Sequence, residues 1–555
     1  QNINRRYDIV YGDVMLNFNY NIRRFDIAAT LGWTGRYENM NNMRVSTNGG
    51  LVTENWFDLN ASRYTASSTL QRMELLKTGY MGTLSLGWDN YLFLELTGRQ
   101  ERSSTLKDQS FFYPSANLSF LFSNAFRMPA WWNHGKLRLS YGVVGNAPET
   151  YAANIIYEQG SDNGFTWNYV PSSWGNANIR PEKKYEYEIG FESKFLNNRL
   201  GFDVSYYNNR VKDQILSTPQ PSTSGVKYVL MNVGEVANEG WDISVSATPV
   251  LTKNFRWDLT ANYGIYRNKV VKLADGVPYL EISNIGGGGA KIQAVEGRPM
   301  GDIYVQVPQM NENGEYLVSD KGLYMNQTEL QRVGNINPDG VGGLFSSFSY
   351  KNIFLDFSID FRIGGDVINE MYQYSTASGL TPESLQFRDT EHGGLSYYYP
   401  GNNNASGVPV QVDPSLGAGP NGETVYHDGV ILPGVVASTG EKNTRIIPAG
   451  YYYNQTYNWG TQPEQLTYRH SVFDNSYVKL RELTIGYQFP EKLISKLGMT
   501  RLSVSVFGRN LFYFYKALKN YDAESSVGTS WASQAVVGGS TTATRNFGVS
   551  LRASF

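Results

Sequence analysis

The chain has 555 residues, a formal net charge of −2 and no cysteine. The balanced charge excludes the strongly basic surface of a polyanion-binding protein, and the lack of cysteine excludes a disulfide framework within the chain. No uninterrupted apolar run approaches the roughly 20 residues that a transmembrane helix requires. A mean hydropathy of −0.39 remains compatible with a membrane β-barrel, because only alternate residues of its strands face lipid.

Segments with a two-residue hydrophobic period predict about fifteen strands. In chain order, the clearest hairpins join residues 14–20 with 25–33, 80–88 with 92–99, 185–195 with 200–206, 241–247 with 255–265, 344–350 with 355–363, and 483–489 with 502–506. A β-bulge is expected near residues 480–483, because the alternation shifts there.

The predicted strands carry one apolar face and one strongly polar face. In residues 185–195, tyrosine, isoleucine and phenylalanine share one face, and the other face holds Glu186, Glu188, Glu192 and Lys194. Unpaired charges are too costly to bury in the core of a β-sandwich. They are compatible with a water-filled lumen, so the pattern indicates a barrel with apolar residues outside and polar residues inside.

Short and long connections alternate along the chain. Tight turns rich in Asn and Asp are expected near residues 21, 89–90, 196–199, 252–254 and 351–352. Long links are expected at residues 35–73, 145–182, 214–239, 269–342, 364–475 and 515–540. This layout predicts an all-β fold, a transmembrane antiparallel β-barrel with short periplasmic turns and long extracellular loops.

The last strand alternates strictly and ends on an aromatic residue. One face carries Phe547, Val549, Leu551, Ala553 and Phe555. We interpret it as the barrel-closing strand, running towards the periplasm. Its partner, the first strand of the barrel, is expected before Gln1, with an odd number of strands preceding this chain.

Seven segments resemble successive barrel strands of SusC/RagA-like TonB-dependent outer-membrane transporters. They are residues 91–106 (YLFLELTGRQERSSTL), 112–126 (FYPSANLSFLFSNAF), 136–146 (KLRLSYGVVGN), 181–216, 232–245 (NVGEVANEGWDISV), 474–497 (DNSYVKLRELTIGYQFPEKLISKL) and 504–522 (VSVFGRNLFYFYKALKNYD). The resemblance covers most of the chain apart from its long loops.

The resemblance implies a barrel of about 22 strands around an amino-terminal plug, of which about fifteen strands fall in this chain. Residues 1–555 are then the carboxy-terminal part of the barrel, with the plug and first strands absent or upstream. The implied function is active import of a glycan or oligopeptide across the outer membrane of a Bacteroidota-like Gram-negative cell. The implied partners are the TonB complex, a SusD-like surface lipoprotein that acts as a lid, outer-membrane lipid and the substrate. A dimer of transporter and lid pairs is one assembly that the resemblance admits.

Residues with catalytic chemistry form no recognisable site. The four histidines are scattered without the spacing of metal ligands, and Glu186 and Glu188 fit a solvated strand face better than an acid and base pair. Residues 311–315 fit a β-turn better than a calcium loop. We therefore expect no catalytic, metal or cofactor site and no enzymatic activity.

Aromatic residues in the long loops are the candidate contacts for substrate or lid. The set is Trp167, Tyr169, Trp174, Tyr397, Tyr398, Tyr399, Tyr451, Tyr452, Tyr453, Trp459 and Trp531. Three roles are open to them: packing the loops on each other, which we favour, docking the lid, or stacking on the substrate. Aromatics nearer the strand ends are expected to form membrane-interface girdles, namely Tyr20, Trp33, Trp88, Trp241, Trp257 and Tyr487.

Two other classes of protein share parts of this pattern. A passive porin or surface adhesin would show the same two-faced strands, and a plug upstream of this chain would distinguish active import from a pore. A secreted carbohydrate-binding all-β protein would lack aromatic girdles and would not fractionate with membranes. Loop aromatics suit glycans and peptides equally, so the cargo class stays open.

Overall fold

The protein is represented by a computed structural model. It describes residues 1–107, 110–162, 165–221, 223, 225–286, 289–458, 468–539 and 543–555. Its internal contacts divide the chain into two units. Unit 1 comprises Gln1–Ala247 and Asn268–Pro278, and unit 2 comprises Thr248–Arg267 and Tyr279–Phe555.

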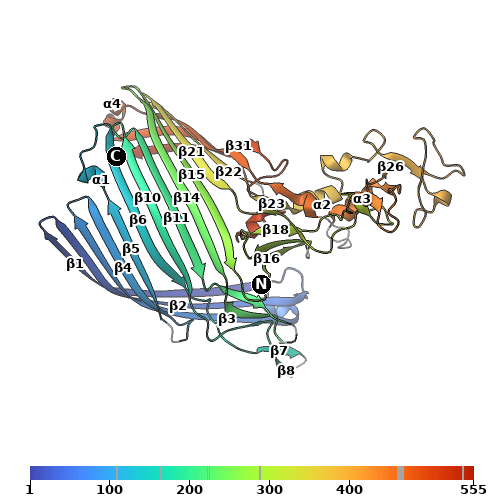
Figure 1. Cartoon of the computed structure of the whole chain (residues 1–555), viewed down its shortest axis with the longest axis horizontal. Coiled ribbons are helices and arrows are strands. Elements are labelled where there is room, and N and C mark those ends of the chain that lie inside the picture. The colour runs from blue at the N-terminus through green and yellow to red at the C-terminus, as the bar shows by residue number, and fades with distance from the viewer. Residues whose placement is uncertain are drawn as a thin grey trace. The chain divides into compact units, whose positions relative to one another are not determined.

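Fifteen strands form one large sheet in which each strand lies beside its neighbours in sequence order, which confirms the predicted fold class (Figure 1). In order they are β1 (Asn2–Ile22), β2 (Phe25–Leu51), β3 (Ser62–Trp88), β4 (Leu92–Ser103), β5 (Ser110–Phe120), β6 (Trp132–Asn146), β10 (Glu182–Phe195), β11 (Leu200–Lys212), β14 (Glu235–Leu251), β15 (Phe255–Lys272), β21 (Gly340–Tyr350), β22 (Ile353–Ile363), β30 (Tyr477–Gln488), β31 (Arg501–Lys516) and β33 (Asn546–Ser554).

The predicted hairpins are present with their turns where expected. β1 and β2 pair antiparallel, as do β3 and β4, β10 and β11, β21 and β22, and β30 and β31. Asp89, Asn90, Asn197, Asn198 and Lys351 have positive φ at the short turns. Asn and Asp tolerate this left-handed conformation better than most residues, which explains why the sequence signalled these turns.

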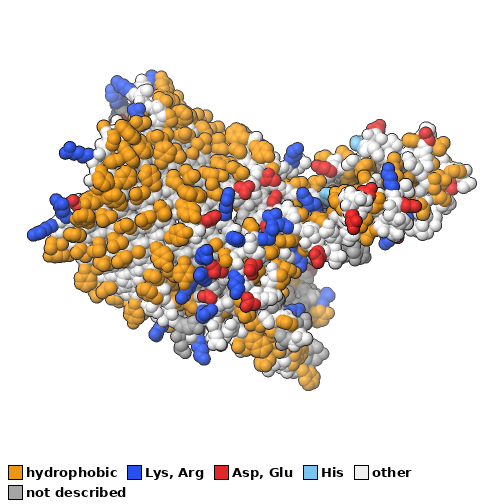
Figure 2. All heavy atoms as spheres, viewed as in Figure 1, with side chains coloured by type: hydrophobic (Ala, Val, Ile, Leu, Met, Phe, Trp, Pro, Cys, Tyr) orange, Lys and Arg blue, Asp and Glu red, His pale blue; other side chains and the backbone are white. Residues whose placement is uncertain are grey.

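In unit 1 the strands have the predicted two faces. Tyr187 and Ile189 of β10 are exposed on the apolar face, and Figure 2 shows hydrophobic side chains gathered over these strands. On the polar face, Arg138 of β6 bridges to Asp203 of β11, with 2.6 Å from Nη2 to Oδ1, and lies 3.4 Å from a carboxylate oxygen of Glu192. The charges of this face are thus paired across neighbouring strands.

The prediction of a long loop at residues 35–73 is wrong. β2 and β3 continue as a hairpin through this segment, with Gly35 opposite Thr78 and Ser46 opposite Ser67, so that only residues 52–61 connect them. The segment is polar on both faces, as in RYENMNN at residues 36–42. Without an apolar face there is no two-residue hydrophobic period to reveal a strand.

The other long connections of unit 1 contain short strands of their own. They are β7 (Glu158–Asp162), β8 (Phe165–Tyr169), β9 (Ser173–Trp174), β12 (Ile215–Pro219) and β13 (Tyr228–Asn232). β7 pairs with β8, and β13 pairs with β12 and β9. Leu106, Phe111 and Ile179 form a small buried cluster among these connections.

Unit 2 carries the largest connections, which are folded. Their strands are β16 (Tyr279–Ile285), β17 (Ala290–Val295), β18 (Asp302–Val305), β19 (Leu317–Val318), β20 (Gln331–Asn335), β23 (Asp366–Asn369), β24 (Leu395–Tyr398), β25 (Val410–Gln411), β26 (Val425–Val430), β27 (Val435–Val436), β28 (Ile447–Pro448), β29 (Val472–Asp474) and β32 (Val536–Val537). Two helices accompany them, α2 (Glu370–Ala377) and α3 (Ala449–Tyr457).

Two further helices, α1 (Phe122–Ala125) and α4 (Glu491–Ile494), lie in connections between sheet strands. No helix in the described part of the chain is both long and apolar enough to cross a bilayer, a finding that concerns helices alone. Within the described residues, β1 pairs only with β2, and β33 pairs only with β31. The side chains of Phe547, Val549, Leu551 and Phe555 are exposed on β33 and at its end.

Candidate ligand-facing loop module

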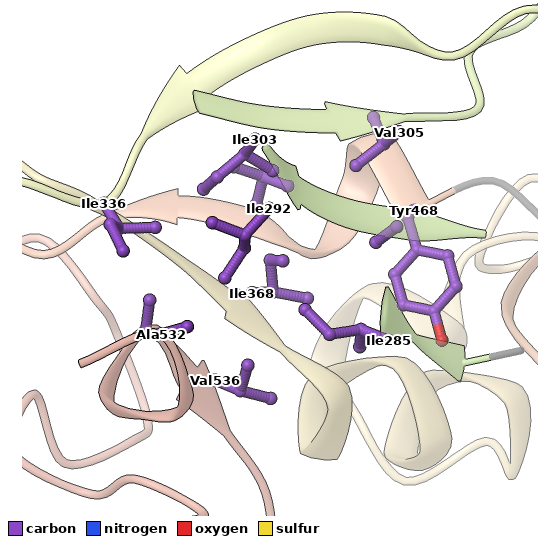
Figure 3. Packing of buried hydrophobic residues seen from close by; sticks show 12 residues of the cluster. Ile285, Ile292, Ile303, Val305, Ile336, Ile368, Tyr468, Ala532 and Val536 are labelled. Atoms are coloured by element: carbon purple, nitrogen blue, oxygen red, sulfur yellow. The ribbon is translucent and has the colours of Figure 1, made fainter. Parts of the chain in front are cut away.

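Three connections share one hydrophobic core, which lies in unit 2. They are residues 273–339 between β15 and β21, 364–476 between β22 and β30, and 517–545 between β31 and β33. We call this cluster the loop core, and Figure 3 shows how its side chains converge: Ile285, Ala290, Ile292, Ile303, Val305, Ile336, Ile368, Tyr468, Val472, Ala532, Ala535 and Val536. Burial of so many aliphatic side chains makes the three connections one folded body, the loop module.

β23 lies at the centre of the loop module. It pairs antiparallel with β29 and parallel with β32, with Ile368 opposite both Val472 and Val536. The carboxylate of Asp366 accepts a hydrogen bond from the backbone N–H of Asn335 at 2.9 Å, which ties in the first connection. Burial raises the pKa of Asp366, against the opposing effect of this hydrogen bond.

Asp302 of β18 is a fully buried carboxylate within the loop module. It accepts hydrogen bonds or ion pairs from Arg298 Nε at 2.5 Å, Arg332 Nε at 2.9 Å and Asn335 Nδ2 at 2.9 Å. Two cations and an amide satisfy its oxygens, so its role is to hold β18, β20 and the preceding turn together. It has no free oxygen to offer as a general base.

The predicted bulge near residues 480–483 is confirmed and falls at Arg481. Glu482 lies opposite Ser358 while Leu480 lies opposite Ile359, so Arg481 is the extra residue of β30. A bulge re-aims a side chain. Arg481 donates to Asp360 Oδ2 through Nε at 2.7 Å and to Glu524 Oε1 through Nη2 at 2.6 Å.

The same cluster contains a buried lysine. Lys479 is 2% exposed, and its Nζ lies 2.5 Å from Glu524 Oε2 and 4.8 Å from the centre of the Tyr513 ring. Burial alone would raise the pKa of Glu524, but the hydrogen bonds from Arg481 and Lys479 outweigh it and lower that pKa. Glu524 therefore fastens the 517–545 connection to the first residues of β30 as an ionised carboxylate.

Predicted tyrosines on α3 divide between the surface and the interior. Tyr453 is buried, and its hydroxyl donates to the carbonyl of Glu383 at 2.7 Å, whereas Tyr452 is partly buried and Tyr451 is exposed. Burial raises the pKa of Tyr452 and of its neighbour Tyr457, so both phenols stay protonated. Tyr453 packs with Tyr457 and Ala449 in a small core between α2 and α3.

Tyr397, Tyr398 and Tyr399 belong to a different cluster. Tyr397 is buried, its hydroxyl donates to Asp428 Oδ1 at 3.1 Å, and its ring stacks on Tyr426 with centroids 5.5 Å apart. Tyr399 is also buried, in contact with Ile446, and Tyr398 is partly buried opposite Val425. The tyrosines predicted as one class of contact thus lie in two separate cores, and a ligand role for them remains a prediction.

The predicted tryptophans differ in accessibility. Trp531 is 39% exposed, and its ring lies so close to Gly301 that a Cβ there would sit 2.9 Å from Trp531 Cη2. Trp167 and Tyr169 are exposed on β8 of unit 1, and Trp174 packs edge-on against Tyr157 at 6.0 Å. Trp459 lies outside the described residues.

Sequence reasoning missed several residues that build the module. Tyr426 of β26 stacks on Tyr397, and Tyr372 of α2 packs edge-on against Phe473 at 5.0 Å. The pairing of Lys479 with Glu524 could not be predicted from the sequence, because the two residues are 45 positions apart and come together only in the folded chain. Among the described residues, no group of three or more His, Asp or Glu side chains has the arrangement of a metal site.

Comparisons with known proteins identify the family to which this architecture belongs. Residues 1–302 match the family model described as "TonB dependent receptor-like, beta-barrel". The chain is 22% identical over 494 residues to TonB-dependent receptor P3 of Formosa agariphila, covering 81% of this chain and 42% of that protein. It is 27% identical over 256 residues to TonB-dependent receptor SusC of Bacteroides thetaiotaomicron, covering 40% of this chain and 24% of that protein.

The same architecture recurs in a solved structure. "Structure of the RagAB peptide transporter" superposes with a TM-score of 0.70 at 18% identity, covering 99% of this chain and 56% of that chain. The identity is low enough that this likeness speaks to the fold alone. The present chain spans less than half the length of the curated relatives it matches.

Proposed function

The chain belongs to the family of TonB-dependent receptor-like β-barrels, and on this premise we propose that it forms part of an active nutrient importer. Family membership confirms the predicted SusC/RagA-like resemblance, the location in the Gram-negative outer membrane and the non-enzymatic class. We take residues 1–555 to be the carboxy-terminal part of the barrel, with the plug and first strands contributed by sequence upstream.

The proposed cargo is a large nutrient, a glycan or an oligopeptide, and the proposed energy source is the TonB complex acting through the plug. The observation that carries the proposal is the loop module, because three long connections are folded around one core at the long-loop end of unit 2. A passive pore does not require its long loops to fold around a common core. A receptor that captures cargo benefits from folded loops, because a preorganised surface loses less conformational entropy on binding. Among the described aromatics of the predicted set in unit 2, Trp531 and Tyr451 are exposed, and we assign both to this surface.

We further propose that a SusD-like lipoprotein docks on the loop module at residues 400–424, which we call the tip. The tip follows β24 and precedes β26, and it exposes the apolar side chains of Val408, Val410 and Leu416. Three exposed apolar side chains close together in the sequence of one loop favour a protein contact. The buried tyrosines behind the tip, such as Tyr397, support it from within.

Removal of the tip tests this proposal. Since Tyr398 lies opposite Val425 in the β24–β26 pair, an Asn-Gly turn can join Tyr399 to Thr424 in place of residues 400–423. In the full-length receptor, we expect the shortened variant to remain a heat-modifiable barrel, to lose co-purification of the lipoprotein and to slow growth on the cargo. Deletion of tonB should abolish that growth altogether.

The matched control shortens residues 52–61, the exposed connection between β2 and β3 in unit 1, and should leave co-purification unchanged. Full co-purification after removal of the tip would refute the docking surface. The import function would be refuted if, for every glycan and peptide tested, growth were the same with and without this receptor and with and without TonB.

A further inference from the structure

The connection between β30 and β31 is longer than the short turns of unit 2 at residues 252–254 and 351–352. β21 and β22 are joined by Lys351 and Asn352 alone, whereas residues 489–500 join β30 to β31. They form α4 (Glu491–Ile494), which continues as a 3-10 turn at Ser495–Leu497 and ends at Gly498 with a φ of +69°. Only glycine adopts this left-handed conformation without strain, which explains the sharp end of the helix.

The helical turn has one face fixed to the sheet and one face exposed. Ile494 is buried, while Leu493 and Leu497 are 64% and 65% exposed. Leu493 of the α-helical turn and Leu497 of the 3-10 turn are thus both exposed beside the buried Ile494, and we call this exposed pair the apolar stripe. The backbone N–H groups of Phe489 and Thr500 donate to Leu502 at 2.9 Å and Ser554 at 2.8 Å, which holds the turn against β31 and β33.

Two lysines border the apolar stripe. Lys492 and Lys496 are exposed, four apart, and in the described part of the chain neither ammonium has a carboxylate within ion-pair distance. Figure 2 shows Lys and Arg side chains gathered at the place where Figure 1 labels α4. The turn therefore presents leucines flanked by unpaired positive charge.

The helical turn directly follows a strand end that belongs to the exposed apolar face of the sheet. On that face Tyr487 of β30 lies opposite Val504 of β31, which lies opposite Leu551 of β33. Phe489, beyond Tyr487, packs edge-on against it at 5.2 Å, and the helical turn follows directly. In an outer-membrane barrel this face contacts lipid, so the helical turn begins where the lipid-facing surface ends.

We propose that the helical turn at residues 491–497 lies in the headgroup layer of the phospholipid leaflet at the short-turn end of the barrel. Leu493 and Leu497 enter the boundary of the acyl chains, while Lys492 and Lys496 pair with lipid phosphates. A short amphipathic helix with basic residues beside its apolar face has the chemistry of an interfacial anchor. The inference goes beyond import itself, because it concerns how this part of the barrel is held at a fixed depth.

The chain contains no cysteine, so a single introduced cysteine is a unique attachment site for a spin label within it. The test places L493C, L497C and the control S495C in the full-length receptor. Ser495 is exposed and points away from the two leucines, since residues two apart lie roughly 200° apart around a helix. The labelled receptors are reconstituted in vesicles of phosphatidylethanolamine and phosphatidylglycerol, mixed roughly three to one.

We expect the labels at positions 493 and 497 to show a ratio of oxygen to nickel-chelate accessibility about threefold or more above that at position 495. K492Q/K496Q should lower this ratio in vesicles with phosphatidylglycerol and leave it unchanged in vesicles of neutral lipid. Equal ratios at all three positions would overturn the proposal, since the turn would then face water. Protection of positions 493 and 497 from both reagents would also overturn it, because protein would then cover the turn.

Discussion

Glu524 is expected to be the most sensitive member of the ion cluster at the base of the loop module. Glu524→Gln removes the carboxylate that faces Lys479 at 2.5 Å and Arg481 at 2.6 Å. Arg481 keeps Asp360 as a partner, but the almost completely buried Lys479 loses the carboxylate within ion-pair distance that the described residues provide, and keeps the face of the Tyr513 ring and the more distant charge of Asp522. An uncompensated buried charge is the costly outcome.

The expected loss of stability follows from this difference between Arg481, which keeps an ion-pair partner, and Lys479, which loses its own. Removal of one partner of a buried ion pair costs about 3–5 kcal/mol, and because the Glu524 side chain is itself 27% exposed we expect about 3 kcal/mol for E524Q. Lys479→Met substitutes an apolar chain of similar length and leaves Glu524 paired with Arg481, so it should cost less than about 1 kcal/mol. The double variant K479M/E524Q should therefore be more stable than E524Q alone.

Hydrogen exchange of the full-length receptor in detergent provides the measurement, read on peptides within residues 518–539. Hydrogen exchange there should be about 100-fold faster in E524Q than in the unmodified receptor, the equivalent of about 3 kcal/mol of lost stability. In the double variant, most of that stability should be regained and exchange should slow again. The control E482Q breaks the more exposed pair with Arg509 and should change exchange by less than about fivefold. A double variant less stable than E524Q would refute the reasoning, because it would mean that Lys479 is not destabilised by losing its partner.

Three further outcomes are expected. Asp302→Asn should destabilise the first connection by about 1–3 kcal/mol and speed proteolysis within residues 290–336, because the buried amide cannot replace the carboxylate as acceptor for both partly exposed guanidinium groups. Ile292→Ala in the loop core should cost about 2–5 kcal/mol in the same assay, against about 0.5–1.5 kcal/mol for Ile292→Val. Hydrogen bonds from backbone N–H groups of Asn421 and Gly401 outweigh desolvation and hold the pKa of Glu423 below its ordinary value. Protection of the tip from protease should therefore be complete above the ordinary glutamate pKa and be lost as the pH falls through the lowered value, and Glu423→Gln should remove this pH dependence.

The sheet could be predicted from sequence because its physics is local. The two-residue period of residues 185–195 and the positive-φ turn at Asp89 and Asn90 each depend on residues close in the chain. The bulge at Arg481 was detectable for the same reason, since one extra residue shifts the period. The extension of β2 and β3 beyond residue 35 could not be predicted, because a strand that is polar on both faces has no hydrophobic period.

The loop module could be predicted only as a set of aromatic-rich segments. Its strands are as short as two residues, and β32, for example, forms by pairing with β23, which belongs to another connection. The sequence could not distinguish Tyr451, which is exposed, from Tyr453, which is buried, because the difference arises from the packing of α3 against residues 383–387. Burial of a loop residue is decided by partners that are distant in sequence.

The loop core also governs how such receptors can be recombined. Ile303, Ile368 and Val536 come from three different connections and pack in one cluster, so none of these connections keeps its interior when moved alone. If only residues 364–476 were transplanted into a related barrel, their core side chains would lack the packing partners that the other two connections provide here. Under the proposed import function, new cargo specificity would then be acquired by exchanging the three connections together, or by changing exposed residues such as Trp531.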